Sequence, residues 1–315
     1  MPTTTPLQGW TPLTPRACFL LTGSDRIRYL NGQITQQVDH LPAGQVRYAV
    51  ITNHKGQLEA DLYFAHHPQT DGILIDAPIE LRDALFTRLD RYIIADDAEL
   101  TDITDDWQVA HLLGNESSQS IENASFQINS DRFGQLGTDL WVPQSQNLTQ
   151  LFQTHQIDQL SPHVLENHRI AQGIPKWNHE LTPGLLPPEA RIEARAIDYQ
   201  KGCYIGQEVI SRIKSVGKVN RRLVLLQVET KGPELTLPCP LWLPSEDQSE
   251  SKPIGTLTSA IKPVETPPHT TEVLALGYLK SQHADPGKQI FAAPAIDAPS
   301  TAQLTVLPFP DSNSS

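Results

Sequence analysis

The chain has 315 residues, of which 36 are Asp or Glu and 24 are Lys or Arg, so its formal net charge is −12. This excess of acid argues against a dedicated nucleic-acid binder, because such proteins neutralise phosphates with basic side chains. No apolar run is long enough for a membrane-spanning helix, and the N-terminus shows no basic, apolar leader. Three cysteines are too few for a disulfide framework, and none are paired at metal-ligand spacing. Composition therefore predicts a cytoplasmic protein with no membrane partner and no metal site.

The first 70 residues predict alternating strands and helices. An apolar run over 17–22 predicts a buried strand, followed by a helix that Ser24 would cap. Residues 46–52 predict a second strand, and the alternation after the next turn predicts its hairpin partner. Glu59 and Asp61 lie two apart on the polar side of that partner. They are either an acid–base pair or, as is more common, the solvated side of the hairpin.

The next elements are marked by clear start and stop signals. Residues 72–77 predict a strand, and Pro78 opens a helix with a leucine stripe. The stretch 96–106 holds six acidic residues and no basic one, which predicts a solvated loop or edge. A helix is expected from Ser161, ending before Gly173.

The C-terminal third predicts a small antiparallel barrel. Its short apolar runs are separated by Pro, Gly and Ser clusters and carry no helical stripe. The runs cover 223–228, 235–243, 254–260, 273–279 and 304–307. We therefore expect a boundary near Val219 that separates domains over 1–219 and 220–315, and a tail over 311–315 without structure.

The most unusual stretch is KGCYIGQE at 201–208. Two glycines flank Cys203 and permit close approach of the backbone to a ligand, and a helix is expected to begin after Gly206. A cysteine just before a helix N-terminus and near a lysine suits a reactive or ligand-contacting thiol. The alternative is a small apolar residue packed beneath the turn. Cys18 and Cys239 lie in apolar runs and are expected in the core.

Positive charge gathers around this stretch. Between residues 191 and 222, eight basic residues accompany three acidic ones, a net charge of +5, which leaves −17 for the rest of the chain. This basic strip suits an anionic partner such as a polycarboxylate, a phosphate or an RNA backbone. A solvated face with salt bridges at a domain interface explains the composition equally well.

The octapeptide resembles the signature of the YgfZ-type folate-binding proteins. These are relatives of the aminomethyltransferase (T-protein) of the glycine cleavage system and of a mitochondrial iron–sulfur assembly factor. Other segments agree in order, namely LTGSD at 21–25, YLNGQIT at 29–35, the Arg169 to Pro175 stretch and IGTLTS at 254–259. The resemblance covers roughly residues 15–280.

For the fold, the resemblance implies an α+β protein. Two intertwined N-terminal α+β lobes and a C-terminal small antiparallel β-barrel would form a ring around a central folate channel. The implied cofactor is tetrahydrofolate or a derivative, whose glutamate tail suits the basic strip. The implied functional thiol is Cys203, and the implied folate-binding residues are Arg169, Lys201, Gly202, Tyr204, Gly206, Gln207, Glu208 and Arg212.

For function, the resemblance implies a monomeric folate-binding protein that is not a classical enzyme. It would support assembly or repair of iron–sulfur clusters in client enzymes, including tRNA-modifying ones. The alternative is a folate-dependent aminomethyltransferase or methyltransferase that uses Glu59 or Asp61, although the adjacent acidic pair of the true aminomethyltransferases is absent here. A third interpretation, an RNA-binding adaptor that uses the basic strip, is disfavoured by the acidity of the remaining chain.

Overall fold

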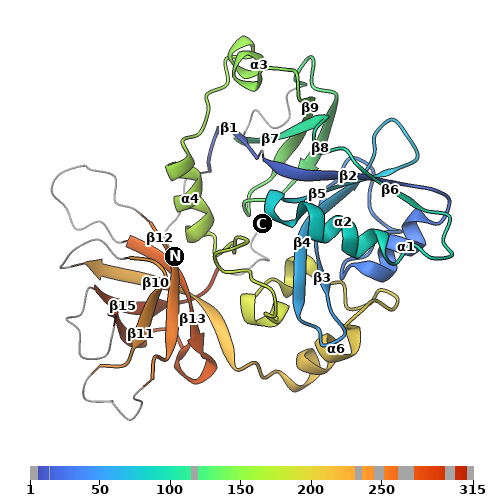
Figure 1. Cartoon of the computed structure of the whole chain (residues 1–315). Coiled ribbons are helices and arrows are strands. Elements are labelled where there is room, and N and C mark those ends of the chain that lie inside the picture. The colour runs from blue at the N-terminus through green and yellow to red at the C-terminus, as the bar shows by residue number, and fades with distance from the viewer. Residues whose placement is uncertain are drawn as a thin grey trace. The chain divides into compact units, whose positions relative to one another are not determined.

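The computed structural model describes residues 6–13, 15–114, 120–230, 236–244, 252–261, 273–294 and 302–310 (Figure 1). The chain divides into two compact units. The first contains residues 1–162 and 193–211, and the second contains residues 163–192 and 212–315. The chain thus leaves the first unit, contributes to the second, returns to the first and finishes in the second. The predicted tail over 311–315 lies outside the described residues.

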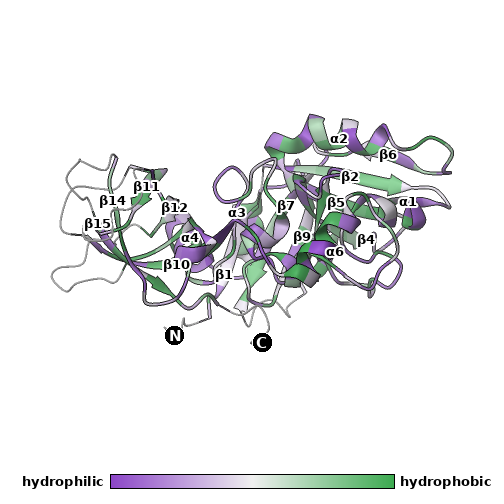
Figure 2. Ribbon diagram, turned by 90° about the horizontal axis from the view of Figure 1, so that it is seen from below, coloured by the Kyte–Doolittle hydropathy of each residue, from purple (hydrophilic) through white to green (hydrophobic). Residues whose placement is uncertain are grey.

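The first unit contains a five-stranded antiparallel sheet with the order β3-β4-β5-β2-β6. Its strands are β2 (Arg16–Thr22), β3 (Arg47–Thr52), β4 (Leu58–His66), β5 (Ile73–Pro78) and β6 (Glu99–Asp102). The helices that follow β2 and β5 are α1 (Arg26–Gln33), the short η1 (Ile79–Leu81) and α2 (Arg82–Asp90). Polar and apolar residues alternate along α2 in Figure 2, as expected for a helix that buries Leu85 and Leu89 and leaves its other side to solvent.

A second antiparallel sheet of the first unit has the order β1-β7-β9-β8. Its strands are β1 (Gly9–Pro12), β7 (Trp107–Leu113), β8 (Phe126–Ser130) and β9 (Gly137–Pro143), and α3 (Leu148–Thr154) follows them. Cys18 and Leu74 of the five-stranded sheet pack with Val109, Ile128 and Trp141 of this sheet in one buried cluster. The two sheets therefore bury apolar surface against each other.

The returning segment, residues 193–211, lies along the edge strand β3. It forms α5 (Glu193–Ala196) and the start of α6 (Gln207–Val216), and α5 contacts β3. Thr35 connects the two: its N–H donates to the Val50 carbonyl of β3 at 3.0 Å, and its hydroxyl donates to the Ala196 carbonyl at 2.6 Å. Thr35 therefore pairs with backbone groups at the edge of β3, and the returning segment is joined to that edge through Thr35.

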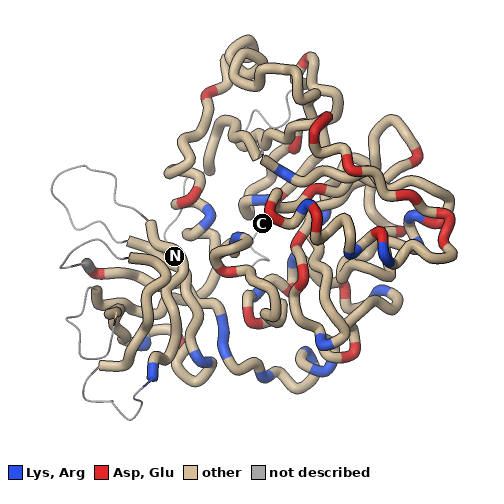
Figure 3. Tube along the Cα trace, in the orientation of Figure 1, with Lys and Arg blue, Asp and Glu red and all other residues tan. Residues whose placement is uncertain are grey.

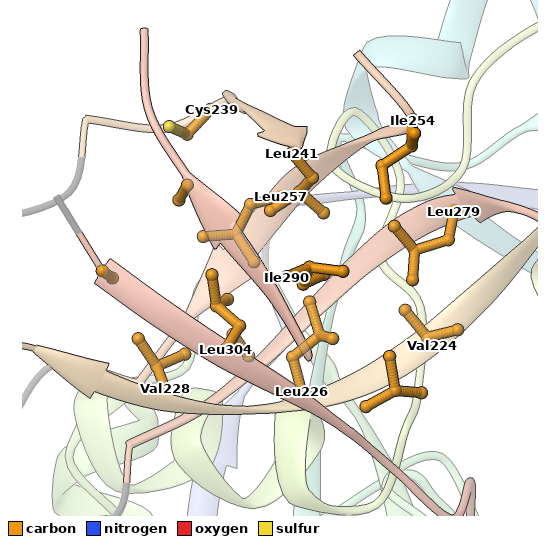
Figure 4. Close-up of a cluster of buried hydrophobic side chains, with 14 of the residues drawn as sticks. Val224, Leu226, Val228, Cys239, Leu241, Ile254, Leu257, Leu279, Ile290 and Leu304 are labelled. Atoms are coloured by element: carbon orange, nitrogen blue, oxygen red, sulfur yellow. The ribbon is translucent and has the colours of Figure 1, made fainter. Parts of the chain in front are cut away.

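The second unit contains a closed six-stranded barrel with the order β10-β13-β12-β11-β14-β15. Its strands are β10 (Arg221–Thr230), β11 (Cys239–Trp242), β12 (Gly255–Ala260), β13 (Val273–Lys280), β14 (Gln289–Ala292) and β15 (Ala302–Leu307). The short helices are α4 (Pro162–Ala171), η3 (Pro187–Ala190) and η5 (Ser281–His283). Figure 4 shows side chains of all six strands gathered in the barrel interior, among them Leu226, Leu257, Ile290 and Leu304.

Most predicted elements are confirmed. The mixed α/β fold with a C-terminal antiparallel barrel is present, Cys18 and Cys239 are buried, and the acidic stretch supplies the edge strand β6. The strand β14 escaped prediction because its four residues are too few to show alternation. The boundary at 219 and the arrangement of the parts around a channel stay predictions. No helix in the described part of the chain is long and apolar enough to cross a membrane.

Two local predictions are wrong. The helix α1 begins at Arg26 with Asp25 as its N-cap, and no side chain caps it. Ser24 instead donates its hydroxyl to Asp97 at 2.7 Å, because the chain at 97 packs against this turn. The polar side of β4 is not solvated throughout: Glu59 is partly exposed and pairs with Arg88, but Asp61 is buried, since the second sheet covers much of that side.

Candidate functional site

The octapeptide forms a loop that ends in the first turn of α6. We call residues 201–206 the signature loop. Gly202 and Cys203 are exposed, whereas Lys201 and Tyr204 are buried. The Cys203 thiol is free. The loop is fixed at both of its ends, so the thiol lies in the exposed part between two anchors.

The Lys201 ammonium fixes the first end of the loop to the end of α1. It donates to the carbonyl oxygens of Asn31, Ile34 and Gln36 at 2.6, 2.7 and 2.9 Å. These acceptors lie at or just beyond the helix C-terminus, where carbonyls lack helical partners. Lys201 is 6% exposed, and burial lowers its pKa to about 8. All three N–H donors of the ammonium are thus engaged by backbone oxygens.

Gly206 fixes the second end of the loop against the turn between β3 and β4. Its φ of +90° lies in the left-handed region that favours glycine. A Cβ atom at this position would lie 2.5 Å from the Asn53 carbonyl oxygen and 2.6 Å from Thr52 Oγ1. The Thr52 hydroxyl also donates to the Ile205 carbonyl at 2.6 Å. Only a residue without a side chain permits this approach.

Tyr204 packs beneath the signature loop. Its ring centroid lies 5.2 Å from the Lys201 ammonium nitrogen, and the residue is 7% exposed. Burial raises the pKa of Tyr204. The Tyr204 hydroxyl has no hydrogen-bond partner among the described residues. Because a buried hydroxyl without a partner is costly, this oxygen is suited to a polar atom of a ligand.

A second polar centre lies on β3 and β4. Asp61 is 8% exposed and accepts a hydrogen bond from the Tyr48 hydroxyl at 3.2 Å. Its Oδ1 atom is buried and has no partner within the part of the chain that the structure describes. Burial raises the pKa of Asp61 to about 6, although Arg16 and Tyr48 oppose the shift. The Arg195 guanidinium, from α5, lies 5.7 Å from the Tyr48 ring centroid. The segment that leads to the signature loop therefore also borders this centre.

Asp61 has the chemistry of a ligand contact. A carboxylate oxygen without a partner can accept an N–H of a bound molecule. A carboxyl group with a pKa of about 6 can also exchange a proton near neutral pH. The centre combines one such carboxyl with the Tyr48 ring and a nearby guanidinium, which suits a flat molecule that carries N–H donors.

A buried ionic network supports β4 beside this centre. Arg132 is 3% exposed and donates to Asp76 of β5 at 2.5 Å and to Asp139 of β9 at 2.8 Å. Its guanidinium lies 3.9 Å from the ring centroid of Tyr63, two residues from Asp61. Burial alone would raise the pKa of Asp139, but Arg132 and His111 lower it to about 2. The network connects the two sheets and fixes the strand that carries Asp61.

The predicted site residues fall into two groups. Those of the octapeptide lie together in the first unit, with Gln207 and Glu208 in the first turn of α6. Arg169 and Arg212 belong to the second unit. Arg169 is 4% exposed and donates to Glu166, Glu180 and Ser259, which anchors α4 to the barrel. Contact of any of these residues with folate stays a prediction.

The basic strip is exposed along α6. Figure 3 shows Lys and Arg positions following one another along α6 and the chain that leads to β10. Arg212, Lys214 and Lys218 are exposed there. Among the described residues, no group of three or more His, Cys, Asp or Glu side chains is arranged to hold a metal ion.

Tyr48 and Arg132 were not predicted as part of a site. The signal for Tyr48 is the register of the hairpin, which places Val50 opposite Asp61 and Tyr48 opposite Tyr63. No local pattern marks Arg132, because its partners come from strands that are distant in sequence.

Comparisons with known proteins agree with this fold. The GCVT N-terminal domain model matches residues 13–138. A mitochondrial iron–sulfur cluster assembly factor IBA57 homolog of Dictyostelium discoideum is 22% identical, with 71% of this chain and 63% of that protein aligned. A tRNA-modifying protein YgfZ of Aliivibrio fischeri is 25% identical, with 67% of this chain and 68% of that protein aligned. The chain thus spans about two thirds of the length of these two relatives.

A solved structure shares the fold of this chain. The crystal structure of the glycine cleavage system aminomethyltransferase T from Bartonella henselae matches with a TM-score of 0.77 over 96% of this chain and 85% of that one, at 16% identity. Residues 13–138 match the GCVT N-terminal domain, and the fold of the chain matches that of an aminomethyltransferase T. In sequence, the chain is similar to YgfZ and IBA57 proteins.

Proposed function

We propose that the chain binds tetrahydrofolate or a derivative in its first unit. The observation that carries the proposal is the buried Asp61 carboxyl, whose Oδ1 atom has no partner in the described part of the chain. The pterin ring of a folate is flat and carries several N–H groups, which are the donors that such an oxygen accepts. Tyr48 donates to the same carboxyl, and the Arg195 guanidinium lies 5.7 Å from the Tyr48 ring centroid. The residues present therefore fit this cofactor.

The rest of the ligand places a second demand on the site. The glutamate tail of folate carries carboxylates, so its binding requires positive charge. The Arg195 guanidinium, which belongs to the first unit and lies near Tyr48, would supply charge for this role. The exposed Gly202 of the signature loop would allow its backbone to approach the ligand, and the Tyr204 hydroxyl would offer a polar contact. When bound, the folate would supply the capacity to carry a one-carbon group.

We also propose that the chain supports iron–sulfur cluster assembly or repair in client enzymes, including tRNA-modifying ones. Relatives are named as an iron–sulfur cluster assembly factor and as a tRNA-modifying protein. The exposed Cys203 thiol suits transient contact with a client or with its cluster as substrate. One thiol cannot hold a cluster alone, so the client would provide the remaining ligands. A free exposed thiol also suits the reducing cytoplasm.

Calorimetric titration with tetrahydrofolate tests the folate site. Wild type and Cys203→Ala are expected to bind with the same affinity, whereas Asp61→Asn is expected to bind at least about tenfold more weakly, because it loses the charged acceptor. Glu59→Gln is the matched control, since Glu59 lies on the same strand but pairs with Arg88. Absence of saturable binding by wild type, or equal binding by Asp61→Asn, would overturn the proposal.

A folate-dependent aminomethyl- or methyltransferase is the second candidate. The pKa of Asp61, raised to about 6, favours it, because a carboxyl with such a pKa can serve as an acid or a base near neutral pH. This candidate predicts turnover of a one-carbon donor with tetrahydrofolate that is lost in Asp61→Asn and kept in Glu59→Gln. Binding of folate without turnover of any aminomethyl donor would exclude it.

A further inference from the structure

The three carbonyl oxygens around the Lys201 ammonium form a complete acceptor set. An ammonium has three N–H donors, and the distances of 2.6, 2.7 and 2.9 Å to Asn31, Ile34 and Gln36 engage all of them. With 6% of Lys201 exposed, the nitrogen has little access to solvent. A cation held in this way has no donor left for a carboxylate of a ligand.

The residues just beyond α1 also form hydrogen bonds with the returning segment. The Gln36 side-chain amide donates to the Arg195 carbonyl at 3.2 Å, and the Asp198 N–H donates to the Thr35 carbonyl at 3.0 Å. These bonds fix the segment as far as residue 198. The Lys201 ammonium is the next anchor along the chain, directly before the two exposed residues of the signature loop.

We propose that Lys201 is a positioning residue that clamps the signature loop to the end of α1 and so presents the Cys203 thiol. The inference rests on the proposed role of that thiol, but it assigns Lys201 a function distinct from binding the ligand. Gly206 holds the far end of the loop through backbone packing, and Lys201 holds the near end through its ammonium. The loop between them is therefore a short bridge whose thiol position depends on both anchors.

Amine labelling of the wild-type chain tests the clamp without any substitution. An acylating reagent is expected to modify Lys201 at least about tenfold more slowly than the exposed Lys218, because the ammonium is buried and fully hydrogen-bonded. Saturating tetrahydrofolate is expected to leave the Lys201 rate unchanged. Labelling of Lys201 as fast as Lys218, or slowing of the Lys201 rate by tetrahydrofolate, would overturn the proposal.

Removal of the ammonium provides the second test. In Lys201→Ala, backbone amides at 201–206 are expected to exchange hydrogen about tenfold faster or more, with exchange in the barrel strands unchanged. Propylammonium, which restores the lost donors, is expected to slow this exchange again, whereas tetramethylammonium at equal ionic strength is not. Unchanged exchange at 201–206, or equal effects of the two cations, would contradict the clamp.

These measurements are independent of the proposed function. The comparison of Lys201 with Lys218 and the exchange measurements are made without folate, so a chain that fails to bind tetrahydrofolate can still show the clamp. Conversely, folate binding with a freely labelled Lys201 would leave the folate site in place and remove the clamp. If Lys201→Ala does not fold, the wild-type labelling rate alone decides the question.

Discussion

Burial of the Asp61 carboxyl destabilises the folded chain at neutral pH. The folded state keeps the Asp61 proton up to about pH 6, whereas the unfolded state releases it near its ordinary value of 3.8. The folded state therefore binds more protons between these values, and the contribution of Asp61 to stability falls as the pH rises through this window. A residue that lowers stability in this way is typical of a position kept for function, here the binding of a ligand.

Asp61→Asn is accordingly expected to stabilise the protein while it weakens the ligand site. The free energy of unfolding at pH 7 should rise by about 1–3 kcal/mol, since an amide avoids the charge and still accepts from Tyr48. The gain should vanish near pH 4, which urea unfolding at the two pH values would show. Glu59→Gln should change the unfolding free energy by less than about 1 kcal/mol at either pH, because its ion pair is partly exposed. A destabilised Asp61→Asn at pH 7 would contradict the assignment.

Cys203 is expected to matter for function and not for stability. Its side chain is exposed and free, so Cys203→Ala should change the unfolding free energy by less than about 0.5 kcal/mol. Support of iron–sulfur client enzymes, measured as client activity in cells, should nevertheless be lost. Cys239→Ala is the control, because Cys239 is buried in the barrel and should affect stability instead. Full client activity with Cys203→Ala would remove the thiol role.

At the scale of elements, the contact between the signature loop and the β3–β4 turn depends on the absence of a side chain at 206. Gly206→Ala should lower the unfolding free energy by about 2 kcal/mol or more, because it adds a steric clash to an unfavourable φ. Gly44 is the matched control: its φ is +73°, but a Cβ atom added there would meet no other atom within 4 Å. Chemical denaturation of Gly206→Ala and Gly44→Ala compares the two, and equal losses would show that the approach to Asn53 is not close.

The connection between the two sheets of the first unit depends on Arg132. Arg132→Met should lower the unfolding free energy by about 3–5 kcal/mol, because the buried Asp76 and Asp139 carboxylates would lose their shared partner. The destabilisation should shrink as the pH falls from about 3.8 to about 2, because wild type loses the stability contributed by the ionised Asp139 in this range and the variant has less of it to lose. A destabilisation of equal size at pH 7 and at pH 2 would show that the network does not carry this stability.

Sequence patterns predicted the individual helices and strands better than they predicted the contacts between these elements. The alternation along β4 and the Pro and Gly signals around the barrel identified strands directly, because they depend on local periodicity and turn chemistry. The burial of Asp61 could not be predicted in this way, since it depends on a second sheet that is distant in sequence. The engagement of Lys201 by three carbonyls likewise follows from tertiary packing, whereas the resemblance implied a ligand contact for this residue.

At the scale of the whole molecule, the second unit contains a buried ion pair with its own hydrogen bonds. Glu180 is 1% exposed, and its carboxylate accepts from Arg169, Thr258 and Ser259. Glu180→Ala should cost about 3–5 kcal/mol, because it removes the fully buried one of the two carboxylates that pair with the Arg169 guanidinium. Hydrogen exchange should accelerate in the barrel strands and α4 and stay unchanged in β3 and β4 of the first unit. Uniform acceleration throughout the chain would indicate that the two units unfold together.

The path of the chain between its units has a consequence for synthesis. Residues 193–211 contact β3, but the ribosome makes them only after residues 163–192, which belong to the other unit. A nascent chain that has completed β3 and β4 therefore lacks the packing of α5 against β3 until about 150 further residues have been translated. The folding of the first unit is thus completed only after α4 has emerged, and the thiol site is the last part of that unit to assemble.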